Sequence, residues 1–217
     1  MHDICNYDTY FIQKQDAVGV LGLIPEQKLT TALRMLAYGA SAEQVDEIAR
    51  MRKSTILECF VRFCDAVENL YTREYLRKPT PRDLQRLLQK GEDRGEYGNR
   101  KGQKSIILEA VASFDCWVWH AFFKVARSQN DLNVLGQSPV SDEVLRGRSP
   151  QVTYQINNTV YSGGKDVERC FGILQARWAI IRGAARMLNE EVLRSIMMTC
   201  IILHNMIVED EYDYPIP

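Results

Sequence analysis

Apolar residues recur every three or four positions in three stretches of the N-terminal half, residues 29–39, 42–51 and 54–70. This interval matches the turn of an α-helix, so each stretch is predicted to form a helix with one apolar face. Ser41 and Gln44 stand three positions apart at the start of the second stretch, which is the spacing of a capping box. The pattern therefore predicts three helices separated by short connections.

Residues that start and stop helices predict a fourth helix and the boundaries around it. Thr80 suits an N-cap, Pro81 the first helical position and Gly91 the C-terminal stop. Residues 92–104 are rich in glycine and charge and contain no aliphatic side chain, so they are predicted to be a linker. Residues 1–25 have no sustained period and are predicted to be an irregular lead-in.

The pattern changes after the predicted linker. Residues 105–113 and 116–123 are rich in β-branched and aromatic residues and are predicted to pair as an antiparallel hairpin. Residues 152–161 are predicted to form a second strand pair, because two central asparagines suit a tight turn. The helical period then returns and predicts two closing helices over residues 165–181 and 190–208.

The order of these elements predicts an α+β protein in two units. The first is a helical, helix-turn-helix-like unit over residues 26–91, and the second is a mixed unit over residues 105–217. The length of 217 residues suits one or two domains of ordinary size.

Charge limits the partners that the whole chain can attract. Lys and Arg number 27 and Asp and Glu number 28, so the net charge is −1. A chain this balanced does not hold nucleic acid by bulk charge, and any such contact must come from a local basic patch.

Cysteine usage and apolar runs indicate an intracellular protein. The six cysteines are scattered among apolar positions, and the N-terminus lacks the pattern of a secretory signal, so free buried thiols are expected. Residues 196–208 are uncharged but only 13 long, against the roughly 20 that a membrane span needs. This segment is predicted to be a core helix, with no membrane contact and no secretion.

The three N-terminal helices have the arrangement of a helix-turn-helix, in which the third would face DNA. Basic residues gather around the start of this third helix: Arg50, Arg52, Lys53 and Arg62. Glu58 is the only acid between positions 50 and 62, which leaves a local charge of +3. These cations are candidate phosphate contacts; the alternative is a generic helical subdomain with a solvated basic turn.

Two acids stand where metal-dependent phosphoryl chemistry could use them. Asp131 lies in a polar turn and Glu168 in the first turn of a predicted helix. Two-metal hydrolysis needs several carboxylates that converge. On spacing alone, Glu168 is equally well explained as an acid at the positive end of a helix dipole.

Several motifs are similar to those of a known family. They are KDVERCFGILQARWAIIRGAARM from Lys165, CIILHNMIVEDE from Cys200, IILEAVAS, WVWHAFF and LRMLAYGAS. Together these segments resemble plant Harbinger-type DDE transposases from about residue 29 to residue 211, most specifically in the last fifty residues.

The resemblance implies a helix-turn-helix followed by an RNase H-like catalytic domain that cuts and joins DNA. Such domains use three carboxylates and a divalent metal, magnesium or manganese. Asp131 matches the second catalytic Asp and metal ligand of the family, and Glu168 matches the catalytic and metal-binding Glu of its V-E-R motif. DNA, a Myb-like partner protein and a nuclear location are also implied, with a cytoplasmic location as the alternative.

The family's first catalytic Asp has no counterpart here. It belongs to a strand before IILEAVAS that this chain lacks, and a second gap falls at residues 162–164. The RNase H-like domain is therefore predicted to be incomplete, the nuclease activity lost or severely impaired, and metal binding uncertain. The alternatives are a non-catalytic module that binds DNA or a Myb-like partner, and a decayed relic.

Overall fold

A computed structural model describes residues 1–76, 92–97, 106–113, 115–125, 154–156, 159–161, 165–182 and 190–213. The chain divides into two compact units that are treated separately below. Residues 1–75 and 172–210 form the helical unit, and residues 76–171 and 211–217 form the sheet unit. The described part of the chain is mostly helical.

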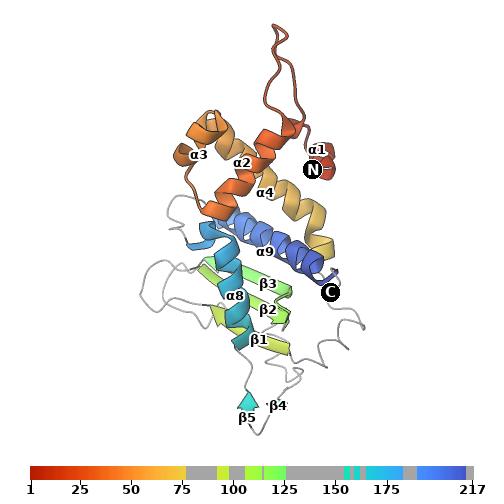
Figure 1. Ribbon diagram of the computed structural model, residues 1–217, viewed down its shortest axis with the longest axis vertical. Coiled ribbons are helices and arrows are strands. Elements are labelled where there is room, and N and C mark those ends of the chain that lie inside the picture. The colour runs from red at the N-terminus through yellow and green to blue at the C-terminus, as the bar shows by residue number, and fades with distance from the viewer. Residues whose placement is uncertain are drawn as a thin grey trace. The chain divides into compact units, whose positions relative to one another are not determined.

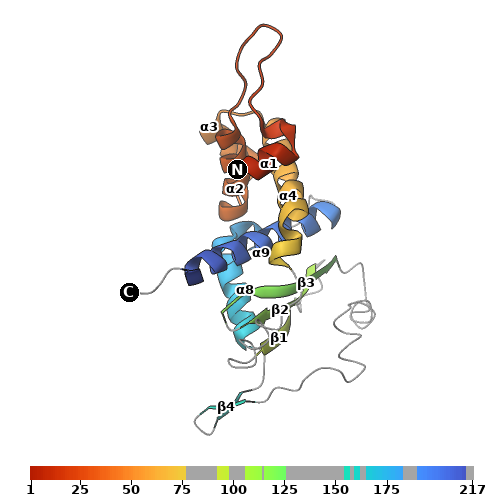
Figure 2. The ribbon, with the colours of Figure 1, turned by 90° about the vertical axis from the view of Figure 1, so that its right-hand side faces the viewer.

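The helical unit draws its elements from both ends of the sequence (Figures 1 and 2). Short elements lie at its N-terminus, and a long helix from the C-terminal part of the chain completes it. The elements are α1 (His2–Tyr7), η1 (Thr9–Phe11), α2 (Pro25–Tyr38), α3 (Ala42–Ala49), α4 (Lys53–Tyr75), the end of α8 (Lys165–Arg177), η2 (Ala179–Arg182) and α9 (Glu190–Asp213).

The three predicted N-terminal helices are confirmed as α2, α3 and α4. The capping box at the start of α3 is present, since the Ser41 hydroxyl accepts from the Gln44 amide and the Gln44 side chain accepts from the Ser41 amide. Helix α2 starts before the apolar period does, because Pro25 occupies its first turn and Gln27 caps the Ile24 amide. Its end at Gly39 is as predicted.

The predicted irregular lead-in contains two short helical elements. In α1 only Ile4 is buried and in η1 only Phe11, so neither element has a repeat that a pattern could reveal. The Lys28 ammonium holds this segment against α2 by donating to the Tyr10 carbonyl at 2.7 Å. Between η1 and α2 the chain forms a loop that projects from the helices (Figures 1 and 2).

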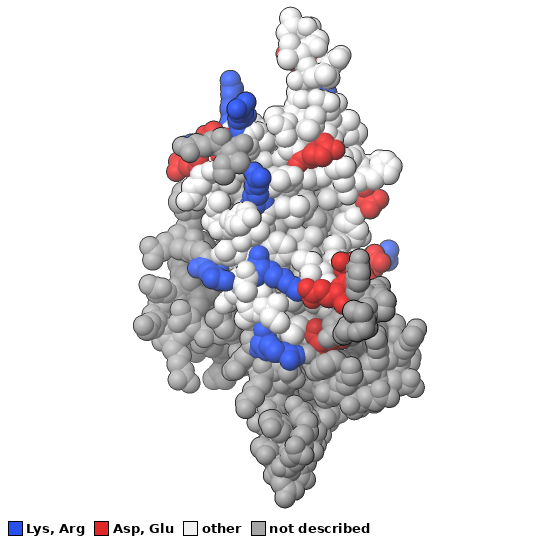
Figure 3. All heavy atoms as spheres, viewed as in Figure 1, with Lys and Arg blue, Asp and Glu red and all other residues white. Residues whose placement is uncertain are grey.

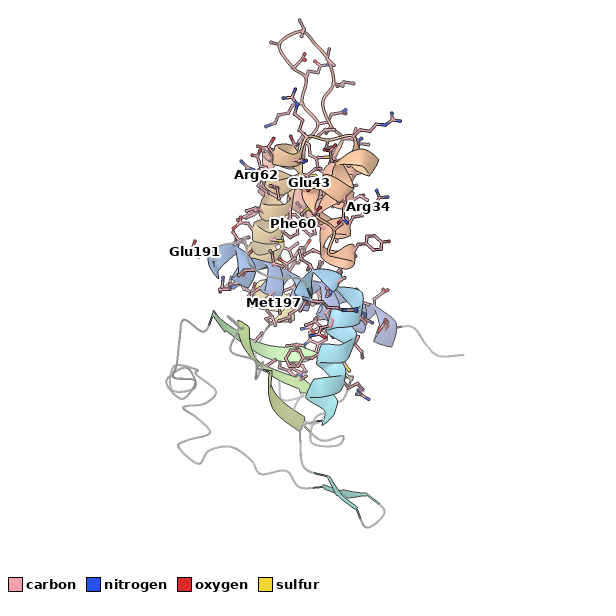
Figure 4. All side chains as sticks on the ribbon, turned by 90° about the vertical axis from the view of Figure 1, so that its left-hand side faces the viewer. Arg34, Glu43, Phe60, Arg62, Glu191 and Met197 are labelled. Atoms are coloured by element: carbon pink, nitrogen blue, oxygen red, sulfur yellow. The ribbon has the colours of Figure 1, made fainter. Side chains whose placement is uncertain are left out.

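The core of the helical unit lies between α2, α4 and α9. Phe60 of α4 and Met197 of α9 point into it, whereas Glu191 points away (Figure 4). The largest fully buried side chains of the unit are Phe11, Phe60, Leu36, Ile56, Leu174, Ile201, Ile202, His204, Val67, Asn205 and Thr199. Burial of aliphatic and aromatic area on this scale is the main force that holds the helices together.

Helix α9 is the predicted core helix. Its segment Glu191–Glu211 is long and apolar enough to cross a membrane. A buried core helix can have the same length and composition. Within the helical unit, the Thr199 hydroxyl donates to the Cys64 carbonyl at 3.2 Å and the Asn205 amide to the Tyr75 carbonyl at 2.7 Å. These buried polar side chains are satisfied by the backbone of α4, which is an arrangement of a protein interior.

The described part of the sheet unit contains a three-stranded antiparallel sheet in the order β1-β2-β3. Strands β2 (Ile106–Ser113) and β3 (Val118–Val125) confirm the predicted hairpin, with a register shift after Val111. Strands β4 (Tyr154–Ile156) and β5 (Thr159–Tyr161) confirm the second pair. The part of α8 that belongs to this unit contacts the β2–β3 connection, where the Cys170 thiol donates to the Cys116 carbonyl at 3.4 Å.

Strand β1 (Glu92–Tyr97) lies inside the stretch predicted to be a linker. It pairs antiparallel with β2 at the edge of the sheet, with Glu92 opposite Ser113 and Tyr97 opposite Leu108. Edge strands are commonly rich in charge, so this one has no apolar alternation that would have predicted it. The predicted helix of residues 80–91 lies outside the described residues.

Candidate functional site

Helices α2, α3 and α4 follow one another with short connections at residues 39–41 and 50–52. Arg50 ends α3 in the left-handed conformation, with φ of 52°. The next residue, Met51, is 4% exposed, and its sulfur accepts a hydrogen bond from the buried Thr31 hydroxyl of α2 at 3.5 Å. The connection before α4 is therefore anchored in the core, which fixes the direction of its neighbouring side chains.

The start of α4 carries positive charge on a helix N-terminus. Arg50 and Arg52 are exposed, and among the residues that the structure describes neither one forms an ion pair. Lys53 is also exposed but lies 2.8 Å from Glu43 of α3. The first turn of α4 contains no acid. Unpaired amides at a helix start and adjacent cations together favour a phosphate group.

The surface around this site is not uniformly basic. On the face shown in Figure 3, basic side chains stand near α3 with acidic side chains beside them. The cations near α3 on this face therefore stand among acids and do not form a continuous basic surface.

Arg62, the fourth predicted DNA contact, is engaged within the helical unit. Its guanidinium lies 2.9 Å from Asp8 and 3.0 Å from Glu58, and 4.6 Å from the centre of the Tyr10 ring. Hydrogen bonding to Asp8, then to Glu58, raises the pKa of Arg62. These contacts tie the N-terminal segment to α4, and a role at DNA stays a prediction.

Asp8 is the acidic centre of this cluster. Burial opposes its ionisation, but the Tyr10 backbone amide and then the Arg62 guanidinium outweigh burial and lower the pKa of the Asp8 carboxyl. The Asp8 side chain accepts from the Tyr10 amide at 2.8 Å and so also caps η1.

Arg34 is a further candidate that the sequence pattern did not single out. It lies on α2 and is partly exposed (Figure 4). Together with Glu26, Gln27, Thr30, Thr31 and Ala49 it lines an open pocket of about 250 Å³. The sequence pattern around Arg34 is that of an ordinary amphipathic helix and does not indicate a pocket. The pocket forms where α3 packs against α2.

The two predicted catalytic carboxylates are not brought together by the described residues. Asp131 lies outside them. Glu168 lies in the first turn of α8, as predicted. Among the side chains that the structure describes, no group of three His, Cys, Asp or Glu residues could hold a metal ion. The metal-binding assignments of Asp131 and Glu168 stay predictions.

Strand β1 occupies the place in the chain where the resemblance predicts a missing strand. It precedes β2 directly and contributes three acids, Glu92, Asp93 and Glu96. In the register, Asp93 stands opposite Ala112, which is 1% exposed. A strand is thus present before β2, with a sequence unlike that of the family's strand.

Comparison with known proteins identifies a class, the transposon-derived proteins of plants. The plant transposon protein family matches the chain over residues 94–164 and 162–215, which is more than half of its length. The chain belongs to this family. The two matched segments meet at residues 162–164, where the resemblance predicts the second gap. No curated protein and no solved structure matches the chain.

Proposed function

We propose that this chain is a transposase-derived DNA-binding protein of the Harbinger-type DDE lineage, with strand cleavage lost or severely impaired. The observation that carries the proposal is the exposed pair Arg50 and Arg52 beside the acid-free start of α4. Membership of the plant transposon protein family supports the lineage. A nuclear location and a Myb-like partner are part of the same proposal.

The local charge available to DNA is smaller than the sequence count of +3. Lys53 forms an ion pair with Glu43, and Arg62 forms ion pairs with Asp8 and Glu58. A phosphate approaching α4 would therefore meet mainly Arg50 and Arg52, with Lys53 in a supporting position. Such contacts position a protein on the duplex without reading its sequence.

Binding of the full chain to duplex DNA, measured by fluorescence anisotropy over a salt series, tests this interface. Each phosphate contact contributes about −0.9 to the slope of log K against log salt. The double variant R50A/R52A is expected to bind more weakly and to have a slope smaller by about 2.

Arg73→Ala is the matched control, because Arg73 lies in the last turn of the same helix. At about 1.5 Å rise per residue, it is roughly 30 Å from the start of α4. A slope near zero for the wild-type chain, or an equal loss in Arg73→Ala, would contradict the proposed interface.

The proposed loss of cleavage rests on the carboxylates. An RNase H-like site uses three acids to hold two divalent cations that clamp the attacking and leaving oxygens. Asp131 and Glu168 match two of these acids, and no residue of this chain matches the first. Removing one carboxylate takes away both a metal ligand and a full negative charge. We therefore expect metal affinity and DNA cutting to be strongly reduced, with magnesium or manganese as the metal if one binds.

A nicking assay on supercoiled DNA with magnesium or manganese tests this half of the proposal. The wild-type chain is expected to nick no faster with metal than with EDTA, and no faster than Asp131→Ala or Glu168→Ala. Glu191→Ala, which removes an exposed acid of α9, is the control for a substitution outside the predicted site. Metal-dependent nicking that disappears in both Asp131→Ala and Glu168→Ala would overturn the proposed loss. If Asp93→Asn also abolished such nicking, β1 would be the source of the third acid.

A further inference from the structure

Two cysteines from distant parts of the sequence meet in the sheet unit. Cys116 follows β2 in the connection to β3, and Cys170 lies on α8, 54 positions later. The Cys170 thiol donates to the Cys116 carbonyl at 3.4 Å. Their exposed fractions are 6% and 2%. The Cys170 sulfur is thus held against the backbone of Cys116, and both side chains are shielded from most of the solvent.

The backbone at Cys116 has an uncommon conformation. Its φ of 66° is in the left-handed region, which is unfavourable for a residue with a side chain. Asp115 supports the turn, since its side chain accepts from the Trp117 amide at 3.3 Å. The Trp117 and Trp119 rings then pack with their centres 5.6 Å apart. A strained conformation that its neighbours maintain is typical of a position with a specific role.

Cys116 also differs in its electrostatics from the buried thiols of the helical unit. The hydrogen bond from Cys170, followed by the positive charge of Arg169, lowers the pKa of Cys116 against the effect of burial. Burial instead raises the pKa of Cys64 to about 12 and raises that of Cys200 well above its ordinary value. The thiolate is the reactive form of cysteine, so the lowered pKa favours Cys116 over Cys64 and Cys200 in the attack on an oxidant.

We propose that Cys116 and Cys170 are a peroxide-oxidisable thiol pair that closes to a disulfide between the β2–β3 connection and α8. The Cys116 thiolate attacks hydrogen peroxide, the O–O bond breaks, and sulfenic acid and hydroxide are formed. The Cys170 sulfur then attacks the sulfenic sulfur, the S–O bond breaks, and the oxygen leaves as water with the thiol proton. In sum, two thiols and one peroxide give one disulfide and two waters. This inference does not depend on DNA binding or cleavage.

Peroxide treatment of the folded, full-length chain, followed by alkylation and a non-reducing peptide map, tests the pair. The expected result is loss of two of the six free thiols and one dominant cross-linked peptide that joins Cys116 to Cys170. Reduction should restore both thiols. Cys64→Ser, which removes a buried thiol of the helical unit, should leave the cross-link unchanged.

Three results would overturn the proposal. They are a different dominant pairing, a stable sulfenic or sulfinic acid at Cys116 without the cross-link, and full retention of both thiols when peroxide oxidises the exposed Cys of a model peptide. The wild-type map alone decides between these, so the test survives a folding defect in Cys116→Ser or Cys170→Ser. Where Cys170→Ser does fold, Cys116 sulfenic acid is expected to accumulate and to be trapped by dimedone.

Discussion

Arg62 shows how a residue selected for its charge can have a structural task. Its exposed guanidinium joins Asp8, Glu58 and the Tyr10 ring, so it links the N-terminal segment to α4. Exposed ion pairs contribute about 0–1 kcal/mol and exposed cation–π contacts about 0.5–1 kcal/mol. The sequence did not predict the contact between Arg62 and Asp8, because the two residues are 54 positions apart.

Substituting Arg62 by alanine is therefore expected to lower the free energy of unfolding by about 1 kcal/mol. Urea denaturation of the full chain measures this change. Arg73→Ala, on the last turn of the same helix, should stay within about 0.5 kcal/mol of the wild type. Equal effects of the two substitutions would show that the cluster does not stabilise the protein.

Asp8 gives this cluster a pH dependence. Its pKa is lowered in the folded state from the ordinary value of 3.8, so the folded protein favours the ionised carboxylate. The stabilisation is fully present above the unfolded-state pKa and is lost as the pH falls through the folded-state pKa. The stability gap between wild type and Asp8→Asn should be constant near neutrality and shrink below about pH 4.

Urea titrations across that pH range measure the gap. Asp210→Asn is the control, because Asp210 is exposed near the end of α9. A gap between wild type and Asp8→Asn that widens on acidification would have the wrong sign for a carboxylate stabilised by Arg62 and the Tyr10 amide.

At the scale of elements, Gly39 sets the path of the chain between α2 and α3. It ends α2 in the left-handed conformation with φ of 61°, and a Cβ there would lie 3.0 Å from the Ala179 carbonyl carbon of η2. A side chain at position 39 would therefore be unfavourable for two reasons. Its φ would be strained, and its Cβ would clash with backbone atoms, which cannot change rotamer as a side chain can. Gly39→Ala is expected to lower the free energy of unfolding by about 2 kcal/mol or more.

Gly172→Ala is the matched comparison. Gly172 is exposed in the middle of α8, and nothing lies within 4 Å of a Cβ built there. Alanine favours a helix interior over glycine by about 0.5–1 kcal/mol, so this variant should be slightly more stable than the wild type. Thermal denaturation of both variants tests the contrast, and similar shifts in Tm would contradict the role of Gly39.

Elements with their own local signals were predictable from the sequence. The capping box of Ser41 and Gln44 and the end of α2 at Gly39 rest on contacts a few residues apart, and the β2–β3 hairpin pairs two strands that follow one another in the sequence. Strand β1 was not predicted, because an edge strand of charged residues has no apolar alternation. Helix α4 extends to Tyr75, five positions beyond its predicted end, because its last turn contacts α9.

The candidate site was predictable in composition and only partly in geometry. Arg50, Arg52 and Lys53 are adjacent in sequence, so their gathering at the start of α4 follows from the helix boundaries alone. The engagement of Arg62 and the meeting of Cys116 with Cys170 depend on tertiary contacts between distant segments. Hydrophobic periodicity tells which face of a helix is buried, but not which partner buries it.

For the whole molecule, the grouping of elements differs from their order along the chain. Helix α9 belongs with α2 and α4, although more than a hundred residues separate them. Besides apolar packing, four polar contacts join α9 to α4: Thr199 to Cys64, Asn205 to Tyr75, Arg194 to Glu68 and Glu209 to Tyr75. A helical unit that both ends of the sequence build in this way should open as one cooperative unit, which a decayed relic would not do.

Asn205 offers the sharpest test of this cooperativity. Its side chain is fully buried, and its amide donates to the Tyr75 carbonyl at 2.7 Å, so Asn205→Ala removes a hydrogen bond inside the core. The loss should cost about 1–3 kcal/mol of unfolding free energy. Because α4 and α9 are expected to open together, hydrogen exchange should accelerate by the same factor in the central amides of both helices.

The control is Glu191→Ala, on the exposed start of α9, which should change exchange in neither helix. Faster exchange confined to α9 would mean that α9 opens alone and that the helical unit is complete without it.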